Sequence, residues 1–274
     1  MKVDDLPPDA LNVCIDRAYD ANPRTTPPRS YIGASGLGNE CDAYLELCLR
    51  GFGEGNVRAQ TRRIMDLGTK IEDMVITDLR LAGYNVLDRD PKTGKQWEWK
   101  LYGGHMQSHA DGVISLGNSA PILLEVKSMN DTYFNKFRKH GLAVSHPKYV
   151  SQCHTLMGMS GFNRTMVVAY NKDKSTYAHE FVALDPLVWQ KQKDRVEKIA
   201  DGKTRRAGYA PDRWPCAFCF KKPACWNGAH APKTCTGCAH AEAVDDGSWY
   251  CTKNKTPATA PCSSWTLFQP LPKR

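Results

Sequence analysis

The sequence predicts an α/β fold in which helices flank a mixed β-sheet, followed by a cysteine-rich, metal-stapled C-terminal segment. Three observations predict this fold. Helical periodicity in the first third gives way to a meander of short apolar runs. A helix, two strands and another helix then follow, which is the element order of a layered α/β core. Seven of the eleven cysteines fall between Cys216 and Cys262, where regular periodicity is lost.

The chain of 274 residues is long enough for one large domain, or for one domain with a small appendage. We divide it into an N-terminal helix and linker (1–34), a core (35–205) and a cysteine-rich metal-binding segment (206–274). The linker is the Pro- and Thr-rich stretch 22–30, and Asp201-Gly202 precedes the change in composition.

Helical patterns recur along the first two parts of the chain. Ser35 is a candidate N-cap for the second helix, and Gly51 ends that helix. In the longest pattern, Ile71 and Val75 lie at helical spacing. The expected helices are 8–19, 37–49, 58–81, 131–139, 147–159 and 186–200.

Short apolar runs between these helices predict strands. The last two expected strands flank the turn residues 171–174 and should form a hairpin. The expected strands are 84–87, 96–102, 105–114, 121–127, 164–170 and 176–183.

Composition is ordinary for a globular protein, with 41% hydrophobic and 24% charged residues. No run has the length of a membrane span, and the first residues lack the apolar region of a signal peptide. We therefore expect a soluble protein of the cytoplasm, or of the host cytoplasm if a phage encodes it. The formal charge of +8 suits a polyanionic partner without identifying one.

The stretch from Asp111 to Lys127 reads as two apolar runs joined by a turn. Residues 121–127 have the pattern of a buried strand, and residues 116–120 are turn-forming. Side chains alternate along a strand, so Glu125 and Lys127 should point to the same face. A hairpin would set Asp111 beside Glu125, with Lys127 next to both.

Two carboxylates that converge in this way form a hard-oxygen site suited to Mg²⁺ or Mn²⁺. A lysine at the same site can position a metal-bound water and balance negative charge. The set of Asp111, Glu125 and Lys127 therefore favours metal-assisted hydrolysis of a phosphodiester. The alternative is an exposed hairpin face that carries an ordinary Glu–Lys pair.

Three further residues are candidates for this site. Glu72 could add a third carboxylate from the long helix, where the alternative is a solvated helix face. Tyr149 and Gln152 are three residues apart, so both lie on one side of their helix. They could bind a phosphate or position a base, or they could form a simple surface pair.

Four motifs in this order resemble the PD-(D/E)xK nuclease superfamily, and in particular the RecB-like and lambda-type phage exonucleases. The motifs are Gly68-x3-Glu72, His109-Ala110-Asp111-Gly112, Glu125-Val126-Lys127 and Tyr149-x2-Gln152. The resemblance covers roughly residues 35–183. It implies a restriction-endonuclease-like sheet in which Asp111 and Glu125 bind the metal, Lys127 is the catalytic lysine, and Glu72 is an additional ligand or orients water. The sequence departs from the pattern at Leu156, where an aromatic residue is often found.

Four of the C-terminal cysteines form a complete ligand set in the sequence. A C-x2-C pair and two later thiolates are what a tetrahedral Zn²⁺ needs. Surface thiols or a disulfide are the alternatives. The set consists of Cys235, Cys238, Cys251 and Cys262.

The other three, Cys216, Cys219 and Cys225, are one ligand short, and Cys41 and His230 are both candidates for the fourth. The C-x2-C-x5-C spacing resembles the iron–sulfur RecB-like nucleases, including the CRISPR-associated and AddB types. In that family one upstream cysteine completes the site, which implies Cys41 and a 4Fe–4S cluster. A second Zn²⁺ is the alternative, since spacing does not distinguish these metals.

Other cysteines and the tryptophans near the metal motifs have simpler interpretations. Cys14, Cys48 and Cys153 are expected to be small buried hydrophobes. Trp214, Trp226, Trp249 and Trp265 are expected to pack a small core around the metals, with base stacking as the alternative. Seven basic residues could line a phosphate track: Lys136, Arg138, Lys139, Lys148, Arg205, Arg206 and Arg213.

The leading hypothesis is a metal-dependent DNA exonuclease or end-processing nuclease of recombination, repair or phage DNA metabolism. The metal would be held by Asp111, Glu125 and the carbonyl of Val126. The expected partners are DNA, as single strands or duplex ends, and a recombination or single-strand-binding protein. One alternative is a non-catalytic nucleic-acid-binding or adaptor protein with this fold, and another is a zinc-ribbon nucleic-acid binder.

Overall fold

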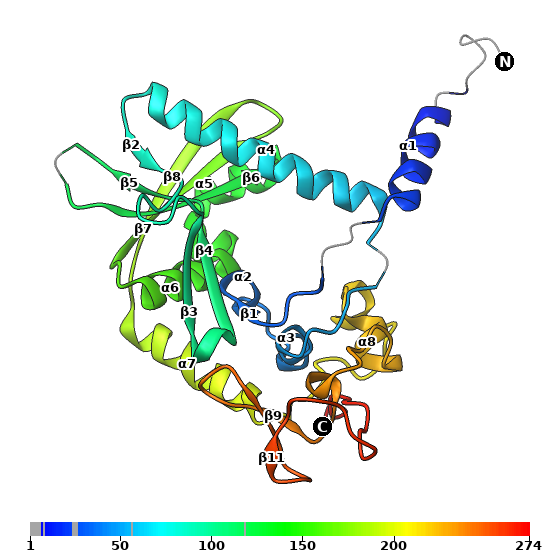
Figure 1. Cartoon of the computed structure of the whole chain (residues 1–274). Helices are drawn as coiled ribbons and strands as arrows, with labels where there is room; N and C mark the ends of the chain where they lie inside the picture. The colour runs from blue at the N-terminus through cyan, green and yellow to red at the C-terminus, as the bar shows by residue number, and fades with distance from the viewer. Residues whose placement is uncertain (1–6, 8, 24–26, 56, 118) are drawn as a thin grey trace.

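The computed structural model describes residue 7 and residues 9–23, 27–55, 57–117 and 119–274 (Figure 1). Three predicted features lie partly outside the described residues: the helix start at Pro8, the linker at 24–26 and the turn residue Asn118. Within the described ranges, no helix combines the length and the apolar character needed to cross a membrane.

The centre of the fold is a mixed five-stranded sheet in the order β2 (Asn85–Leu87), β5 (Gly112–Ser115), β6 (Ile122–Met129), β7 (Arg164–Asn171) and β8 (Thr176–Ala183). β6 and β7 are parallel, and the other neighbours are antiparallel. A parallel pair needs a long crossover. Here α5 (Asp131–Ser145) and α6 (Pro147–Ser160) provide it. This topology confirms the predicted α/β class with a mixed sheet.

One face of this sheet is covered by the long helix α4 (Ala59–Leu81), as predicted from its periodicity. Ile71 and Val75 lie one turn apart and pack against Leu124 and Val126 of β6. Burial of a side chain of this size stabilises the fold by about 1.5–3 kcal/mol. The helix is therefore held against the sheet by its apolar stripe.

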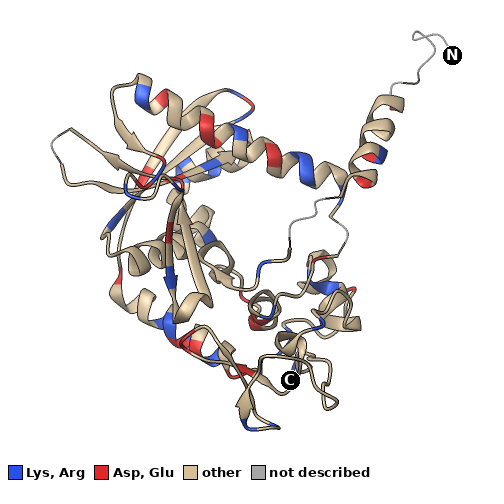
Figure 2. Ribbon diagram, in the orientation of Figure 1, with Lys and Arg blue, Asp and Glu red and all other residues tan. Residues whose placement is uncertain are grey.

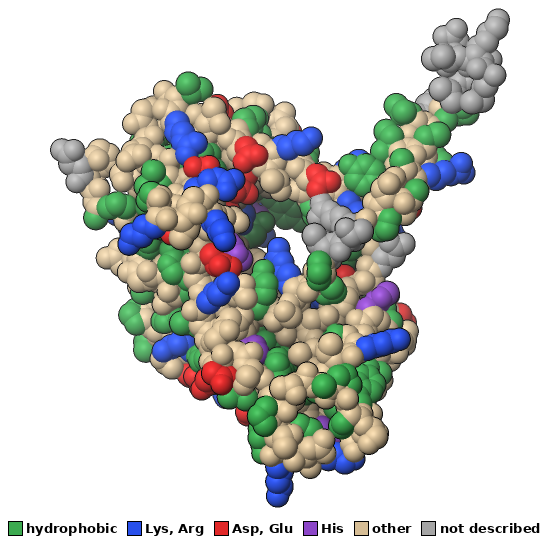
Figure 3. All heavy atoms as spheres, viewed as in Figure 1, with side chains coloured by type: hydrophobic (Ala, Val, Ile, Leu, Met, Phe, Trp, Pro, Cys, Tyr) green, Lys and Arg blue, Asp and Glu red, His purple; other side chains and the backbone are tan. Residues whose placement is uncertain are grey.

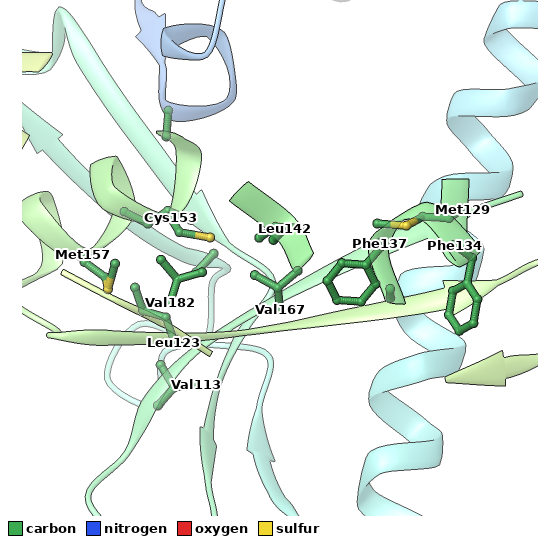
Figure 4. Close-up of a cluster of buried hydrophobic side chains, with 14 residues drawn as sticks. Val113, Leu123, Met129, Phe134, Phe137, Leu142, Cys153, Met157, Val167 and Val182 are labelled. Carbon is green, nitrogen blue, oxygen red and sulfur yellow. The ribbon is translucent and has the colours of Figure 1, made fainter. Parts of the chain in front are cut away.

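The opposite face is covered by α5 and α6 (Figure 4). Phe137 of α5 and the α6 residues Cys153 and Met157 pack on Leu123 and Val167 of the sheet. Cys153 is fully buried in this cluster, which confirms its prediction as a small buried hydrophobe. Consecutive β6 residues therefore alternate between two cores, because successive side chains of a strand point to opposite faces.

A second, three-stranded sheet stands beside the first, in the order β1 (Ile32–Gly33), β4 (Met106–Ala110) and β3 (Trp97–Leu101). It packs with the short helix α2 (Ala34–Leu37), with α3 (Asp42–Leu49) and with α7 (Pro186–Ala200). The side chain of Asp185 accepts hydrogen bonds from Leu187 N and Val188 N, so it caps the N-terminus of α7. A 3₁₀ turn, η2 (Tyr102–Gly104), joins β3 to β4.

Two sequence predictions about continuous elements are wrong. The helix expected at 37–49 is divided into α2 and α3, and Cys41 rather than Ser35 occupies an N-cap position. At the division, Gly38 lies so close to α6 that a Cβ atom there would be 2.9 Å from Cα of Lys148, so only a glycine fits. The strand expected at 105–114 is divided at Asp111 into β4 and β5, which belong to different sheets.

The cysteine-rich segment forms a small lobe beside α3 (Figure 1). Its elements are η3 (Cys216–Phe218), α8 (Lys222–Asn227), η4 (Cys235–Gly237), β9 (Ala241–Ala243), β10 (Trp249–Cys251) and β11 (Thr256–Pro257). Leu47 and Phe52 pack against Ala224 and Phe268 of this lobe. The lobe is thus joined to the core by a small apolar cluster of its own.

Arg50 makes a buried polar connection between the same two regions. Its guanidinium donates to Glu46 at 2.7 Å and to the carbonyls of Thr236, Cys238 and Ala241 at 2.9–3.0 Å. The group also lies over the ring of Phe268, 3.9 Å from the centroid. Thr204 donates a hydrogen bond to the other oxygen of Glu46. All three guanidinium nitrogens of Arg50 and both carboxylate oxygens of Glu46 therefore have a hydrogen-bond partner.

The first helix, α1 (Ala10–Ala21), projects from the N-terminal end of α4 and has no buried residue (Figure 1). Arg62 of α4 holds it by donating to Tyr19 O and to the Asp20 carboxylate. Cys14 on this helix is exposed, so its prediction as a buried residue is wrong: the helix stands out from the core and buries none of its residues.

Candidate active site

The candidate active site begins at the point where the chain passes from one sheet to the other. Asp111 lies between β4 and β5, and Gly112 pairs with Leu124 in the antiparallel β5–β6 ladder. This register sets Asp111 next to the β6 segment that contains Glu125. The carboxylate accepts a hydrogen bond from Val126 N at 2.7 Å. The predicted hairpin is therefore present, and a backbone donor orients its aspartate.

Glu125 is the most enclosed group of the site, with 1% of its surface exposed. Its Oε1 accepts hydrogen bonds from Gln152 Nε2, at 2.6 Å, and from Lys127 Nζ. Its Oε2 is buried and accepts no hydrogen bond from any described residue. A buried carboxylate oxygen without a partner is costly, and a hard cation is the natural partner for it.

Lys127 shares the face of Glu125, as strand alternation predicts, and its side chain is 19% exposed. Burial lowers the pKa of Lys127, but the negative charges of Glu125 and Asp111 outweigh burial and raise this pKa above its usual value. The lysine therefore remains a cation at the site. Its ammonium group lies over the ring of Tyr149, 5.0 Å from the centroid.

Glu72 faces the same site from α4. Burial and then the charge of Glu125 raise the pKa of Glu72, and Lys127 acts in the opposite direction. Burial and Glu125 also raise the pKa of Asp111 well above its usual value. Three mutually repelling carboxylates with one lysine have a deficit of positive charge, which a divalent cation would supply. Figure 2 shows acidic and basic residues interspersed along α4.

An aromatic row extends the site outward from Tyr149. His146 stacks on Tyr149 with ring centroids 5.1 Å apart and planes at 4°, and Tyr133 meets His146 edge-on at 5.7 Å. Sequence reasoning identified Tyr149 but missed His146 and Tyr133. His146 could have been found from its position directly before Pro147, where α6 begins. It lies three residues before Tyr149, a spacing that places two side chains on one side of a helix.

Four cysteines meet around a small cavity of about 20 Å³ between α3 and the C-terminal lobe. The cavity is also lined by Arg206, Lys221 and Trp226. Burial raises the pKa of the Cys225 thiol to about 11, although Arg206 lowers it. His230, the other candidate, instead lies against Gly53, whose N donates to its carbonyl oxygen. The four cysteines are Cys41, Cys216, Cys219 and Cys225.

Cys48 also lies near this group and is only partly buried. Burial raises its pKa, Lys221 lowers it, and Tyr44 shares a hydrogen bond with the thiol. The prediction that Cys48 is a simple buried hydrophobe therefore omitted its polar neighbours.

The remaining C-terminal cysteines are gathered around the β-hairpin of the lobe. Asn254 donates from N to Cys251 Sγ and from Nδ2 to Cys262 Sγ, both at 3.4 Å. Burial, followed by the charges of Cys238, Cys251 and Cys262, raises the pKa of Cys235. Thr266 N donates to Cys238 Sγ at 3.5 Å. Such N–H···S bonds stabilise thiolates, which are the form of cysteine that binds metal.

In the described part of the chain, no group of three or more His, Cys, Asp or Glu side chains has the arrangement of a finished metal site. The unpaired oxygen of Glu125 and the four-cysteine cavity nevertheless fit metal ligands by their chemistry. A larger cavity of about 460 Å³ lies on the α4 side of the sheet, between Leu79, Tyr84, Met166 and Phe181. None of the sequence-predicted site residues lines that cavity.

No protein-family model and no curated protein matches the chain. Among solved structures, an alkaline exonuclease (LHK-Exo) from Laribacter hongkongensis is 19% identical, covering 64% of this chain and 88% of that chain with a TM-score of 0.45. The same exonuclease in complex with dAMP gives 18% identity, 63% and 87% coverage, and a TM-score of 0.46. A phage-related exonuclease from Haemophilus somnus 129PT is 11% identical, with 71% and 81% coverage and a TM-score of 0.37. Likenesses at this level carry no functional assignment, which must come from the side chains of the site.

Proposed function

We propose that the chain is a metal-dependent deoxyribonuclease that hydrolyses phosphodiester bonds at DNA ends, in recombination, repair or phage DNA metabolism. The observation that supports this most directly is the unpaired Oε2 of Glu125 at a site with two other carboxylates and a lysine. In a purely structural Glu–Lys pair, both buried carboxylate oxygens are expected to accept hydrogen bonds.

In this proposal Asp111, Glu125 and the Val126 carbonyl hold Mg²⁺ or Mn²⁺, and Glu72 is a further ligand or orients water. When bound, such an ion activates water and stabilises charge on the phosphorane-like transition state. Lys127 positions the attacking water and balances the charge of the phosphate.

Three donors prepare the two carboxylates for this role. Gln152 and Lys127 both bond to Oε1 of Glu125, which leaves Oε2 directed to the ligand position. Val126 N fixes one oxygen of Asp111 in the same way. Tyr149 supports the lysine through its ring face and could also contact a phosphate.

The test is a cleavage assay with end-labelled single-stranded and duplex DNA in Mg²⁺, Mn²⁺ or EDTA. We expect cleavage with either metal, none with EDTA, and loss of cleavage in Glu125→Gln, which keeps the size of the side chain. Metal-independent cleavage, or full activity of Glu125→Gln, would refute the proposal. DNA binding without cleavage under all conditions would support the adaptor alternative.

The proposal also assigns metals to the two cysteine groups. Cys41, Cys216, Cys219 and Cys225 would hold a 4Fe–4S cluster, with Zn²⁺ as the alternative, and their common cavity supports this grouping. Cys235, Cys238, Cys251 and Cys262 would hold Zn²⁺, which the hydrogen bonds to their sulfurs support. Anaerobically purified protein should absorb near about 400 nm if iron–sulfur is present. A colourless preparation with two zinc ions per chain would establish the zinc alternative.

A further inference from the structure

Three large aromatic side chains near the four-cysteine cavity are exposed to solvent. Tyr209 is 72% exposed, Trp214 80% and Phe218 82%, and no other described aromatic side chain exceeds 54%. Of the four tryptophans expected to pack a small core, Trp226 and Trp249 do join apolar clusters, but Trp214 does not. A group of large exposed apolar side chains can mark an interaction site. Figure 3 shows hydrophobic side chains at the surface of the C-terminal lobe.

These rings project from a tightly folded backbone. Ala217 N donates to the carbonyl of Arg213, which closes a tight turn that holds Trp214 and the 3₁₀ turn of Phe218 close together in the chain. Gly208 lies so close to this turn that a Cβ atom there would be 2.7 Å from Cys216 Sγ. Tyr209, the next residue, is therefore held beside the same turn. The rings are thus presented by a fixed support, although they are not buried by it.

The surroundings of the rings are strongly basic. Six Lys and Arg residues lie between Gly202 and Pro223, against one acidic residue, Asp212. Arg206 and Lys221 are used inside the lobe, where they donate to the carbonyls of Cys225 and Phe52. The others reach the surface or its edge: Lys203, Arg205, Arg213 and Lys222.

The C-terminus adds to the same charge. Lys273 Nζ lies over the Tyr209 ring, 4.5 Å from the centroid, and the Tyr209 hydroxyl donates to the carbonyl of Arg274. The basic character of the surface around the rings therefore comes from two parts of the chain.

We propose that Tyr209, Trp214 and Phe218 form a platform on which bases of single-stranded DNA stack while the neighbouring cations contact its phosphates. The inference rests on the proposed function for its choice of DNA. Aromatic faces interleaved with Lys and Arg match the two components of a single strand, its bases and its phosphates. A duplex keeps its base faces stacked on one another, so it would use only the cations.

The test measures binding of a fluorescein-labelled oligothymidylate by fluorescence anisotropy, with the metal-loaded full chain in magnesium-free buffer. Trp214→Ala and Phe218→Ala should each weaken binding about 5- to 160-fold, the range for loss of one stacked base. Trp214→Phe should retain most of the affinity. Leu187→Ala is the matched control, because Leu187 is 72% exposed on α7 and has no part in the platform. That control should bind as the wild type does.

An abasic oligonucleotide of the same length distinguishes the contribution of base stacking from that of the phosphate charge. On it, wild-type protein and Trp214→Ala should bind equally, while Arg213→Ala should weaken binding to both strands. Undiminished oligothymidylate binding by Trp214→Ala and Phe218→Ala would overturn the platform and leave a protein partner as the occupant of this surface. An equal loss on the abasic strand would also overturn it, since no base is then involved.

Failure of the platform can be distinguished from failure of the nuclease proposal. Binding is measured without cleavage, and Glu125→Gln should bind oligothymidylate like the wild type. If Glu125→Gln still cleaves while Trp214→Ala loses binding, the assignment of the carboxylate site is wrong and the platform stands. The metal content and melting temperature of Trp214→Ala should be unchanged, which excludes misfolding as the cause.

Discussion

The carboxylate site and the cysteine-rich lobe both gather ligand-type side chains, but they are built by different means. At the carboxylate site, the β5–β6 ladder and the cores on both sides of the sheet set every position. In the lobe, three short strands make few ladder bonds, and one buried arginine supplies much of the polar contact with the core. We infer that the first site is preformed without metal, whereas the second depends on its metals for stability.

The largest expected effect separates activity from stability at the first site. Asp111→Asn should reduce cleavage about 1,000-fold or more, because a ligand and part of the charge that holds the metal are removed. Its melting temperature should stay the same or rise, since one of three mutually repelling buried carboxylates becomes neutral. Cleavage rates and thermal denaturation measure the two effects. A large loss of stability would show that the site is not preformed.

The next effect concerns the connection between the two regions. Arg50→Met should lower the free energy of unfolding by roughly 3–5 kcal/mol, since it leaves Glu46 buried without its cation. Urea denaturation measures this, and protease sensitivity should appear first in the lobe. Adding Glu46→Gln should recover part of the loss, because the amide carries no charge and can keep the contact with Thr204. Full stability of Arg50→Met would show that the apolar cluster of Leu47 and Phe52 holds the lobe alone.

Loss of a ligand from the two cysteine groups should destabilise different parts of the protein. Cys41→Ser should release one metal group and destabilise the whole chain by roughly 2–4 kcal/mol, the range for a cross-link that restricts the unfolded chain. Cys235→Ser should release zinc and expose only the tail to protease. Metal analysis and limited proteolysis compare the two, and Cys14→Ser is the control because Cys14 is exposed and remote from both groups. If both substitutions loosen only the tail, the long-range metal link is wrong.

The grouping of Asp111, Glu125 and Lys127 could be predicted because its determinants are local. Alternation along β6 and one turn are enough to bring Asp111, Glu125 and Lys127 together, and the structure shows this grouping. The same local reasoning failed at Asp111 itself, where one apolar run is shared by two sheets. Which sheet a strand joins is decided by its pairing partner, here Trp97 for β4 and Leu124 for β5, and an apolar run does not show where the partner changes.

The lobe was less predictable, since its packing depends on contacts across more than a hundred residues. The spacing of cysteines grouped Cys216, Cys219 and Cys225, and the structure places Cys41 rather than His230 with them at one cavity. Nothing in the local sequence around Arg50 indicates that its guanidinium meets carbonyls of residues 236–241. The exposure of Trp214 was missed for the same reason, because composition alone favoured a buried tryptophan.

The smallest expected effect tests whether the aromatic row beside the carboxylate site positions Lys127. His146 touches none of the proposed ligands, but it stacks on Tyr149, whose ring supports Lys127. Burial and then the charge of Lys136 lower the pKa of His146, so its ring is neutral near neutral pH and acts as a flat surface. His146→Ala should therefore lower kcat about two- to tenfold, which corresponds to one aromatic pair. KM should change little, because the lysine is displaced while the DNA contacts remain.

His146→Phe distinguishes this positioning role from a general loss of packing. A phenyl ring can keep the stack on Tyr149 and the edge contact with Tyr133, so His146→Phe should restore kcat to near the wild-type value. If a proton on the imidazole were needed instead, His146→Phe would be as slow as His146→Ala. A drop in melting temperature that accounts for the lost rate in both variants would mean that His146 serves only the packing of α5 on α6. The carboxylate site would then depend on its backbone ladder alone, and the aromatic row would have no part in placing Lys127.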